Sequence, residues 1–200
     1  MKKNAILFGA FIFVAAVMFV PMGGSIVPEE ESVVNVQGLD LSGFSDKKSD
    51  KALHLLFIHH SCGGQLFADV GESDGENAIY KTHPNGGGLR TLLQKQGYSV
   101  HEAAYNSDIG HQTDLFDWLP KFRDTMNTVL RCAHQDTLYS DGTTNDIVVF
   151  KSCYPNSNFV GEGTGPGTPQ GPELTVCNAQ AAYAELLSEF QKYPDVLFVC

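Results

Sequence analysis

Two clusters of polar residues carry side chains that could take part in a reaction. Two histidines and Ser61 follow the apolar run Leu53–Ile58, and Asn156 follows a second apolar run at 146–151. A hydroxyl beside imidazoles is typical of a nucleophile that a base activates, and a side-chain amide can donate a hydrogen bond to an oxyanion. We therefore expect a nucleophile at Ser61 and an oxyanion donor at Asn156.

The elements that position these residues are predicted from the apolar runs. Each run lacks polar alternation, which is typical of a strand buried on both faces of a parallel sheet, and ligands bind beyond the carboxyl ends of such strands. The alternation of strands and helices predicts an α/β fold, a three-layer sandwich with a parallel sheet. We expect further strands at 98–103 and 196–200, helices at 89–96, 121–132 and 175–193, and a long connection at 66–84.

The N-terminal part of the chain predicts export. Two lysines precede the apolar segment 5–20, and small residues follow it, which is the layout of a secretory signal peptide. We therefore interpret 1–25 as a signal peptide, with an uncleaved signal anchor as the alternative. The polar segment 26–52 is interpreted as a disordered linker, which leaves 53–200 for a single domain.

Charge restricts the partners of the chain. The formal net charge is −10, and the sequence contains no basic cluster. Such a protein is a poor candidate for binding nucleic acid or an anionic membrane surface. We expect a neutral or small substrate, contact with a membrane only through the N-terminal segment, and a periplasmic or extracellular location.

The motifs HHS (59–61), SDIG (107–110) and FKSCYPNS (150–157) resemble those of the SGNH (GDSL-like) hydrolases. They are most similar to those of secreted bacterial proteins with an HHS first block and an FKSCxPNS third block. The resemblance implies a serine esterase, lipase or deacetylase with an SGNH/flavodoxin-like fold, acting on a small-molecule or carbohydrate ester without a cofactor. It implies that Ser61 is the nucleophile and that the N–H of Gly110 and the amide of Asn156 stabilise the oxyanion.

The sequence departs from the family pattern at the general base. The family's Asp-x-x-His block is absent, and the last expected strand has no loop or helix after it. We interpret the domain as incomplete, with its C-terminal part missing, and expect the base beyond residue 200. A chain ending there should be poorly soluble and at most weakly active. Within the chain, His111 is the best candidate because it follows Gly110. His59 and His60 point in different directions, and neither is expected to have a carboxylate that fixes its tautomer.

Two other functions remain open at the level of the sequence. One is a binding module without catalysis, a hydrolase-like scaffold that has lost its base and retains a pocket. In a purely structural interpretation, Ser61 is only a turn or helix-cap residue and Gly110 only a turn residue. The other is a metal-binding hydrolase that uses His59, His60 and His111 together with aspartates of neighbouring loops. The spacing of these residues matches no familiar metal signature, so we rank the serine hydrolase first.

Five cysteines in an exported chain predict at least one disulfide. A bond between Cys153 and Cys177 would close a loop rich in glycine and contribute roughly 3 kcal/mol of stability. Cys62 lies next to Ser61 and is an alternative nucleophile. Cys132 and Cys200 are left unassigned.

Overall fold

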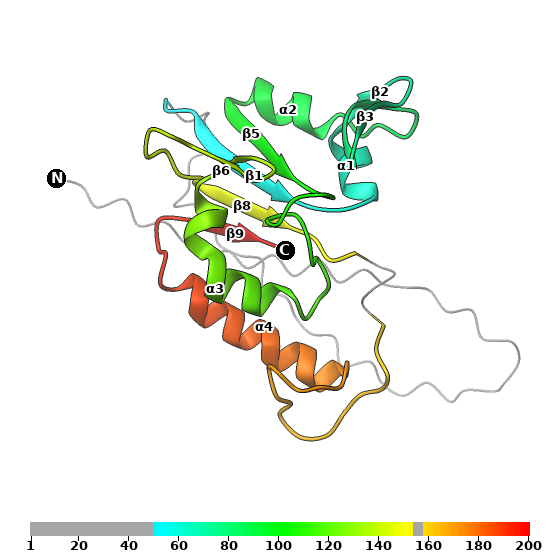
Figure 1. Ribbon diagram of the computed structural model, residues 1–200, viewed down its shortest axis with the longest axis vertical. Helices are drawn as coiled ribbons and strands as arrows, with labels where there is room; N and C mark the ends of the chain where they lie inside the picture. The colour runs from blue at the N-terminus through cyan, green and yellow to red at the C-terminus, as the bar shows by residue number, and fades with distance from the viewer. Residues whose placement is uncertain (1–49, 154–157) are drawn as a thin grey trace, which may run out of the picture.

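The centre of the molecule is a parallel sheet, seen in a computed structural model that describes residues 50–153 and 158–200 (Figure 1). Its four strands lie in the order β5-β1-β8-β9 and are all parallel. The strands are β1 (Leu53–Ile58), β5 (Tyr98–Ala103), β8 (Ile147–Phe150) and β9 (Leu197–Val199). The predicted parallel sheet is thus confirmed. The predicted signal segment, all but the last residues of the linker, and Asn156 lie outside the described residues.

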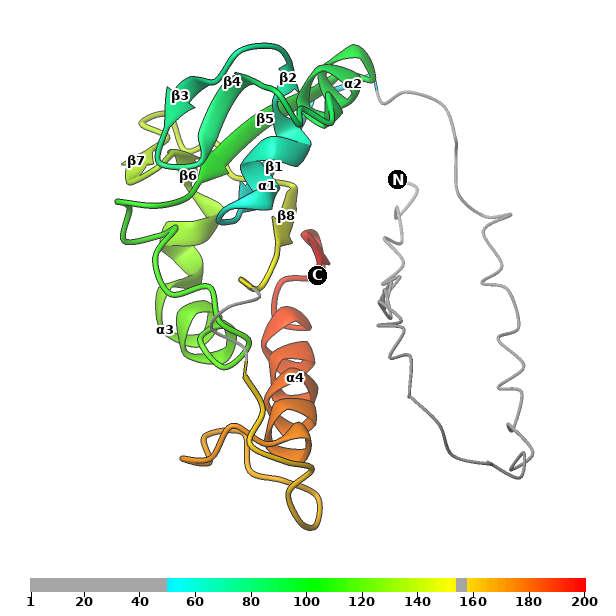
Figure 2. The ribbon, with the colours of Figure 1, turned by 90° about the vertical axis from the view of Figure 1, so that its right-hand side faces the viewer.

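Helices cover both faces of the sheet (Figures 1 and 2). On one face lie α1 (Cys62–Phe67) and α2 (Leu89–Lys95), and on the other lie α3 (Trp118–Leu130) and α4 (Val176–Phe190). The predicted mixed α/β fold is confirmed. In the part of the chain that the structure describes, no helix is both long and apolar enough to span a membrane.

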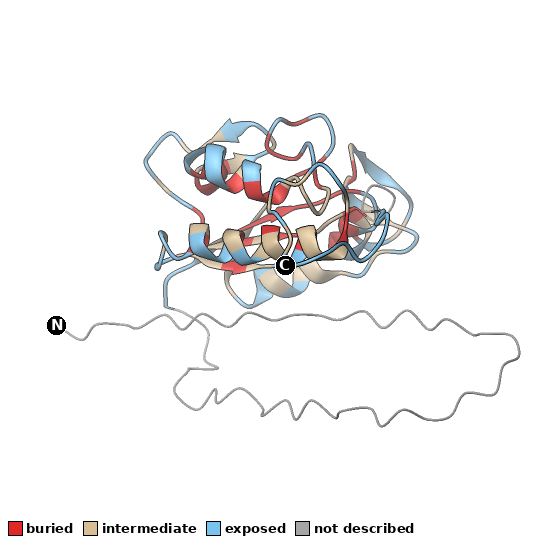
Figure 3. Ribbon diagram, turned by 90° about the horizontal axis from the view of Figure 1, so that it is seen from below, coloured by how far each residue is buried: buried red, intermediate tan, exposed pale blue. Residues whose placement is uncertain are grey.

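The continuous apolar run in β1 follows from this double covering. Leu55 and Phe57 belong to the cluster beneath α1 and α2, whereas Leu56 and Ile58 belong to the larger cluster beneath α3 and α4. Successive side chains of a strand point to opposite faces, so a strand with helices on both sides needs an apolar residue at every position. Figure 3 shows the buried segments gathered in the middle of the molecule.

The segment 66–84 is not the long connection that we expected. It contains the end of α1 and three short strands, β2 (Asp69–Val70), β3 (Asp74–Glu76) and β4 (Ile79–His83), in the order β2-β4-β3. Asn77 and Ala78 join β3 to β4, and both have positive φ angles, 54° and 63°. A two-residue hairpin loop of this kind normally carries glycine at its second position, so the alanine hides the turn from sequence reasoning.

A second hairpin lies beside the open edge of β5. Its strands are β6 (Cys132–His134) and β7 (Thr137–Leu138). The N–H of Gln135 in its turn donates to the carbonyl of Glu102 on β5 at 2.9 Å. The hairpin thereby brings the side chains of its turn close to the end of β5.

The predicted disulfide between Cys153 and Cys177 is not formed. All five cysteines lie in the described part of the chain, and no disulfide bond forms between any two of them. Cys153 is buried just beyond β8, where its N–H donates to the carbonyl of Thr113. Cys177 is in the first turn of α4, and its N–H donates to the carbonyl of Glu162. The backbone at each cysteine is therefore tied to a different segment.

Candidate functional site

Ser61 occupies a strained turn between β1 and α1, at the carboxyl edge of the sheet. Its φ and ψ are 46° and −117°, and its side chain makes no capping hydrogen bond to α1. Its hydroxyl is exposed and lies 3.2 Å from the hydroxyl of Tyr105. Residues that carry a side chain avoid such a conformation unless the surrounding structure imposes it, and such strain is concentrated at functional sites. A sharp strand-to-helix turn of this kind presents the nucleophile in many hydrolases.

Two glycines allow the chain to turn so sharply after Ser61. A Cβ atom on Gly63 would lie 2.6 Å from Cβ of His59, and one on Gly64 would lie 1.7 Å from the carbonyl oxygen of Ala78. Neither distance is tolerated between non-bonded atoms, so both positions require glycine. α1 is therefore packed directly onto the end of β1 and onto the start of β4.

His60 fixes the loop that follows β5 and carries Gly110, which is the second loop of the site. It makes no hydrogen bond to Ser61. Its Nε2 lies 2.8 Å from the carbonyl oxygen of Gly110, and its Nδ1 lies 3.0 Å from Oγ1 of Thr113. A carbonyl only accepts, so Nε2 carries the proton and Nδ1 accepts from the threonine hydroxyl. The ring also stacks on Tyr105 with centroids 3.9 Å apart. Both nitrogens are thus occupied, which excludes His60 as the base for Ser61 in this conformation.

The environment of His60 predicts a loss of stability in mild acid. Burial lowers its pKa below the ordinary value of 6.5, although the bond to Gly110 opposes the shift. The unfolded chain then binds the proton more tightly than the folded one, so the stability present above pH 6.5 should decline as the pH falls below it. We expect the Tm to fall between pH 7 and pH 5, and to fall less in His60→Gln. The exposed His134 provides the control, since His134→Gln should keep the wild-type slope in calorimetry.

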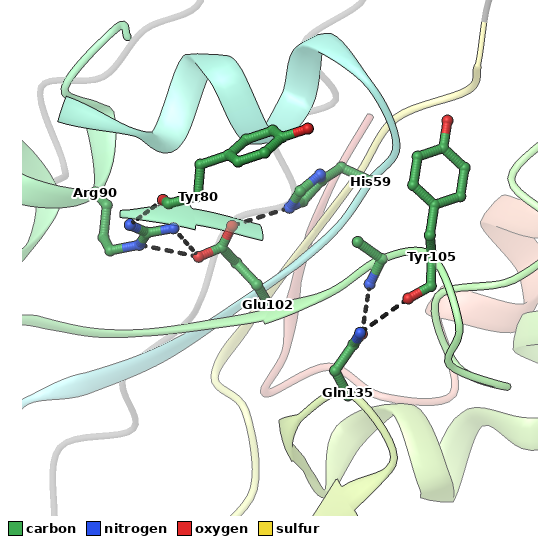
Figure 4. Close-up of polar contacts among 7 residues, drawn as sticks. His59, Tyr80, Arg90, Glu102, Tyr105 and Gln135 are labelled. Carbon is green, nitrogen blue, oxygen red and sulfur yellow. Dashed lines mark hydrogen bonds and ion pairs between the residues drawn. The ribbon is translucent and has the colours of Figure 1, made fainter. Parts of the chain in front are cut away.

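His59 points to the opposite face of the sheet from His60, as expected for neighbouring residues at a strand end. It is fully buried, and its Nε2 lies 3.0 Å from Oε1 of Glu102 (Figure 4). Its Nδ1 has no hydrogen-bond partner among the described residues. The expectation that His59 lacks a carboxylate is therefore wrong, because Glu102 on β5 supplies one from 43 residues away. Only the pairing of β1 with β5 reveals it.

Gly110 is placed on the second loop beside His60, but its N–H is already occupied. The N–H donates to Oγ of Ser107 at 3.0 Å, and the carbonyl accepts from His60. A Cβ at this position would lie 2.1 Å from the carbonyl oxygen of Ala104. The glycine is thus required for close packing, and the expected oxyanion donor is engaged within the loop in this conformation.

Polar side chains from the turn of the β6-β7 hairpin fix the rest of this loop. Gln135 accepts from the N–H of Ala104 at 2.8 Å and donates to the carbonyl of Tyr105 at 2.9 Å (Figure 4). Asp136 accepts from the hydroxyl of Ser107 at 2.8 Å. The hairpin β6-β7 therefore holds Tyr105 in place beside Ser61, a role that no pattern in the sequence indicated.

Lys121 of α3 anchors the far end of the same loop. Its ammonium group donates to the carbonyls of Ile109, at 2.9 Å, and His111, at 2.6 Å. Burial lowers the pKa of Lys121 to about 8. The ammonium group is therefore still charged at neutral pH, but its burial costs free energy. The side chain of His111 is exposed and extends from a backbone that Lys121 fixes.

The structure does not assemble the alternative metal site. No group of three or more histidine, cysteine or acidic side chains suited to a metal ion occurs within residues 50–153 and 158–200. His59 and His60 lie on opposite faces of the sheet and have separate partners, Glu102 and Gly110. Cys62, the alternative nucleophile, is exposed next to Ser61.

A scan against protein-family models finds no match, and searches of the curated proteins and of the solved structures give no significant match either.

Proposed function

We propose that this protein is an exported serine hydrolase of the SGNH type that cleaves an ester or acetyl group with Ser61 as the nucleophile. The strained and exposed Ser61 at the carboxyl edge of β1 carries the proposal. The strand order β5-β1-β8-β9 supports it, because the chain passes from β1 to β5 on one side of β1 and then returns to β8 on its other side. Ligands bind in open α/β sheets where the strand order reverses in this way.

An oxyanion site next to Ser61 is part of the proposal. Within residues 50–153 and 158–200, no hydrogen-bond partner is seen for the N–H of Ser61 or of Cys62, at the start of α1. Backbone N–H groups of this kind stabilise the negative charge that develops on a carbonyl oxygen under attack. The amide of Asn156 is proposed as a further donor, on the strength of the sequence motif alone.

The general base is proposed by comparing the histidines next to Ser61 with the histidine on the second loop. His59 is fully buried, and both ring nitrogens of His60 are engaged in hydrogen bonds. The side chain of His111 is exposed, and Lys121 holds its backbone carbonyl. His111 is therefore the candidate base among the described residues. The hydroxyl of Tyr105, 3.2 Å from that of Ser61, would orient the nucleophile.

A fluorophosphonate probe tests the proposal directly, because it reacts covalently with an activated serine. We expect peptide mass spectrometry to find the probe on Ser61 of the full chain and no labelling in Ser61→Ala. A chelator should not reduce labelling, whereas it would abolish activity that depends on a metal ion. A folded wild-type protein that resists the probe would instead support the binding module without catalysis.

A further inference from the structure

A buried chain of charged and polar groups leads from α2 to the residue two positions before Ser61. Nε of Arg90 donates to Oε2 of Glu102 at 2.9 Å, and a second guanidinium nitrogen of Arg90 contacts the same oxygen. Oε1 of Glu102 lies 3.0 Å from Nε2 of His59. The side chains of His59, Glu102 and Arg90 are 0%, 6% and 19% exposed. The third nitrogen of Arg90 donates to the carbonyl of Tyr80 at 2.8 Å, so its whole fork is used (Figure 4).

The chain of contacts fixes the role of one nitrogen of His59. A carboxylate paired with arginine accepts hydrogen bonds, so Nε2 of His59 carries a proton and donates it to Glu102. The Nδ1 of His59 is buried and has no hydrogen-bond partner among the described residues. An orphaned polar atom is costly in a buried place, and it is tolerated only when its surroundings hold the ring there.

The backbone that follows Ser61 packs against the ring of His59. The ring itself packs against Phe57 and Phe67, with ring centroids 4.5 and 6.2 Å away. A Cβ on Gly63 would lie 2.8 Å from its Cγ and 3.0 Å from its Nδ1, so the backbone of α1 lies directly on the ring. Any rotation or tilt of the ring must move Gly63, and the turn at Ser61 between them must change with it.

We propose that Glu102, held by Arg90, is a positioning residue that acts through His59 to keep Ser61 in its strained conformation. This inference rests on the proposed function, since it assigns the support of the same nucleophile. Glu102 does not touch Ser61. Its effect is to prevent the ring of His59 from turning, which in turn prevents the Ser61 turn from relaxing. Displacement of a reacting group by about 1 Å is enough to lower turnover by about 10²-fold.

Glu102→Gln is the sharpest single test, because it keeps the size of the side chain and removes its charge. We expect kcat for p-nitrophenyl acetate to fall by about 10²-fold while KM stays within about twofold. Arg90→Met should act in the same direction, and the double variant should lose little more than the larger single loss, since both break one chain of contacts. His101→Asn is the matched control. His101 precedes Glu102 on β5 and has its own hydrogen bonds, to Ala133 and Ser99, yet it takes no part in this chain.

Nitrogen-15 NMR of the histidines and backbone amides separates positioning from general stabilisation. We expect wild-type His59 to show the tautomer protonated at Nε2, and Glu102→Gln and Arg90→Met to disturb it and shift the amides of Ser61 and Cys62. His101→Asn should leave all three signals in place even if it lowers the Tm. Unchanged amides and unchanged kcat in either folded variant would overturn the positioning role.

The same measurements distinguish failure of the inference from failure of the proposed function. If Ser61→Ala retained full hydrolysis, the serine hydrolase would be refuted, and the NMR signals of Ser61 and Cys62 would still decide whether Glu102 holds the turn. If Ser61→Ala abolished hydrolysis but Glu102→Gln left kcat unaltered, only the inference would fail. Should Glu102→Gln not fold, Arg90→Met takes its place, because Arg90 is less buried.

Discussion

Ser61→Ala should lower kcat for short p-nitrophenyl esters by about 10⁴-fold or more, to the background that substrate binding alone provides. Loss of the nucleophile in serine proteases has an effect on the order of 10⁶-fold, because no other group can form the acyl-enzyme. The side chain of Ser61 is exposed, and within residues 50–153 and 158–200 its one hydrogen bond is to Tyr105, so its removal should leave the fold unchanged. Stopped assays of initial rate, with circular dichroism of the same samples, measure both effects.

Cys62→Ala is the matched control for this loss. Cys62 is the next residue, is also exposed and keeps its backbone N–H after substitution, so turnover should remain within about twofold of wild type if the serine is the nucleophile. The reverse pattern, with Cys62→Ala inactive and Ser61→Ala active, would assign the reaction to the thiol. Equal activity in all three proteins would remove this turn from the catalytic site.

Gly64→Ala should destabilise the protein severely, by about 3 kcal/mol or more. The added methyl group would lie 1.7 Å from the carbonyl oxygen of Ala78, which is backbone and belongs to a tight hairpin turn. Neither the helix nor the hairpin can yield without losing contacts, so the cost should reach the upper range of overpacking. Urea denaturation followed by circular dichroism gives the change in the free energy of unfolding.

Gly71→Ala offers a comparison at a glycine that does not lie against the backbone of another segment. Its new Cβ would lie 3.0 Å from Cβ of Thr82, a contact that a shift of a few tenths of an ångström relieves, and we expect a loss below about 1 kcal/mol. Equal losses at Gly64 and Gly71 would contradict the close packing of α1 onto the hairpin. A small loss at both would show that α1 can shift to make room.

The main sheet could be predicted because its signal is local. β1 begins at the predicted residue, β5 begins and ends at the predicted residues, and β8 and β9 differ by one residue at each end. Burial on both faces requires uninterrupted apolar runs, and such runs are visible in a single sequence. The small sheet of β2, β3 and β4 was missed because its strands are short and polar, and its turn at Asn77 and Ala78 has no glycine.

The site was only partly predictable, for a different reason. Ser61 could be found because it lies between a predicted strand and a predicted turn. His60 could be found because it directly precedes Ser61. The partners that decide what these residues do come from distant parts of the chain: Glu102 for His59, Gly110 for His60 and Gln135 for the loop that carries Tyr105. Such contacts depend on strand pairing and hairpin placement, which leave no pattern at a fixed spacing in the sequence.

The central place of β1 in the sheet also governs when the molecule can assemble. β1 is the first strand of the sheet in sequence, yet it pairs with β5 and β8, and the N–H of His54 bonds to Asp146, 92 residues later. Such a contact forms only after a large loop has closed, and closing the loop costs conformational entropy before the contact contributes any favourable energy. Assembly of the sheet is therefore slow. A ribosome-bound chain that ends before residue 146 therefore carries β1 as an apolar strand with one edge unpaired. The strand that carries the Ser61 turn therefore keeps one edge unpaired until β8 has been made, and the partly made chain is exposed to aggregation until then.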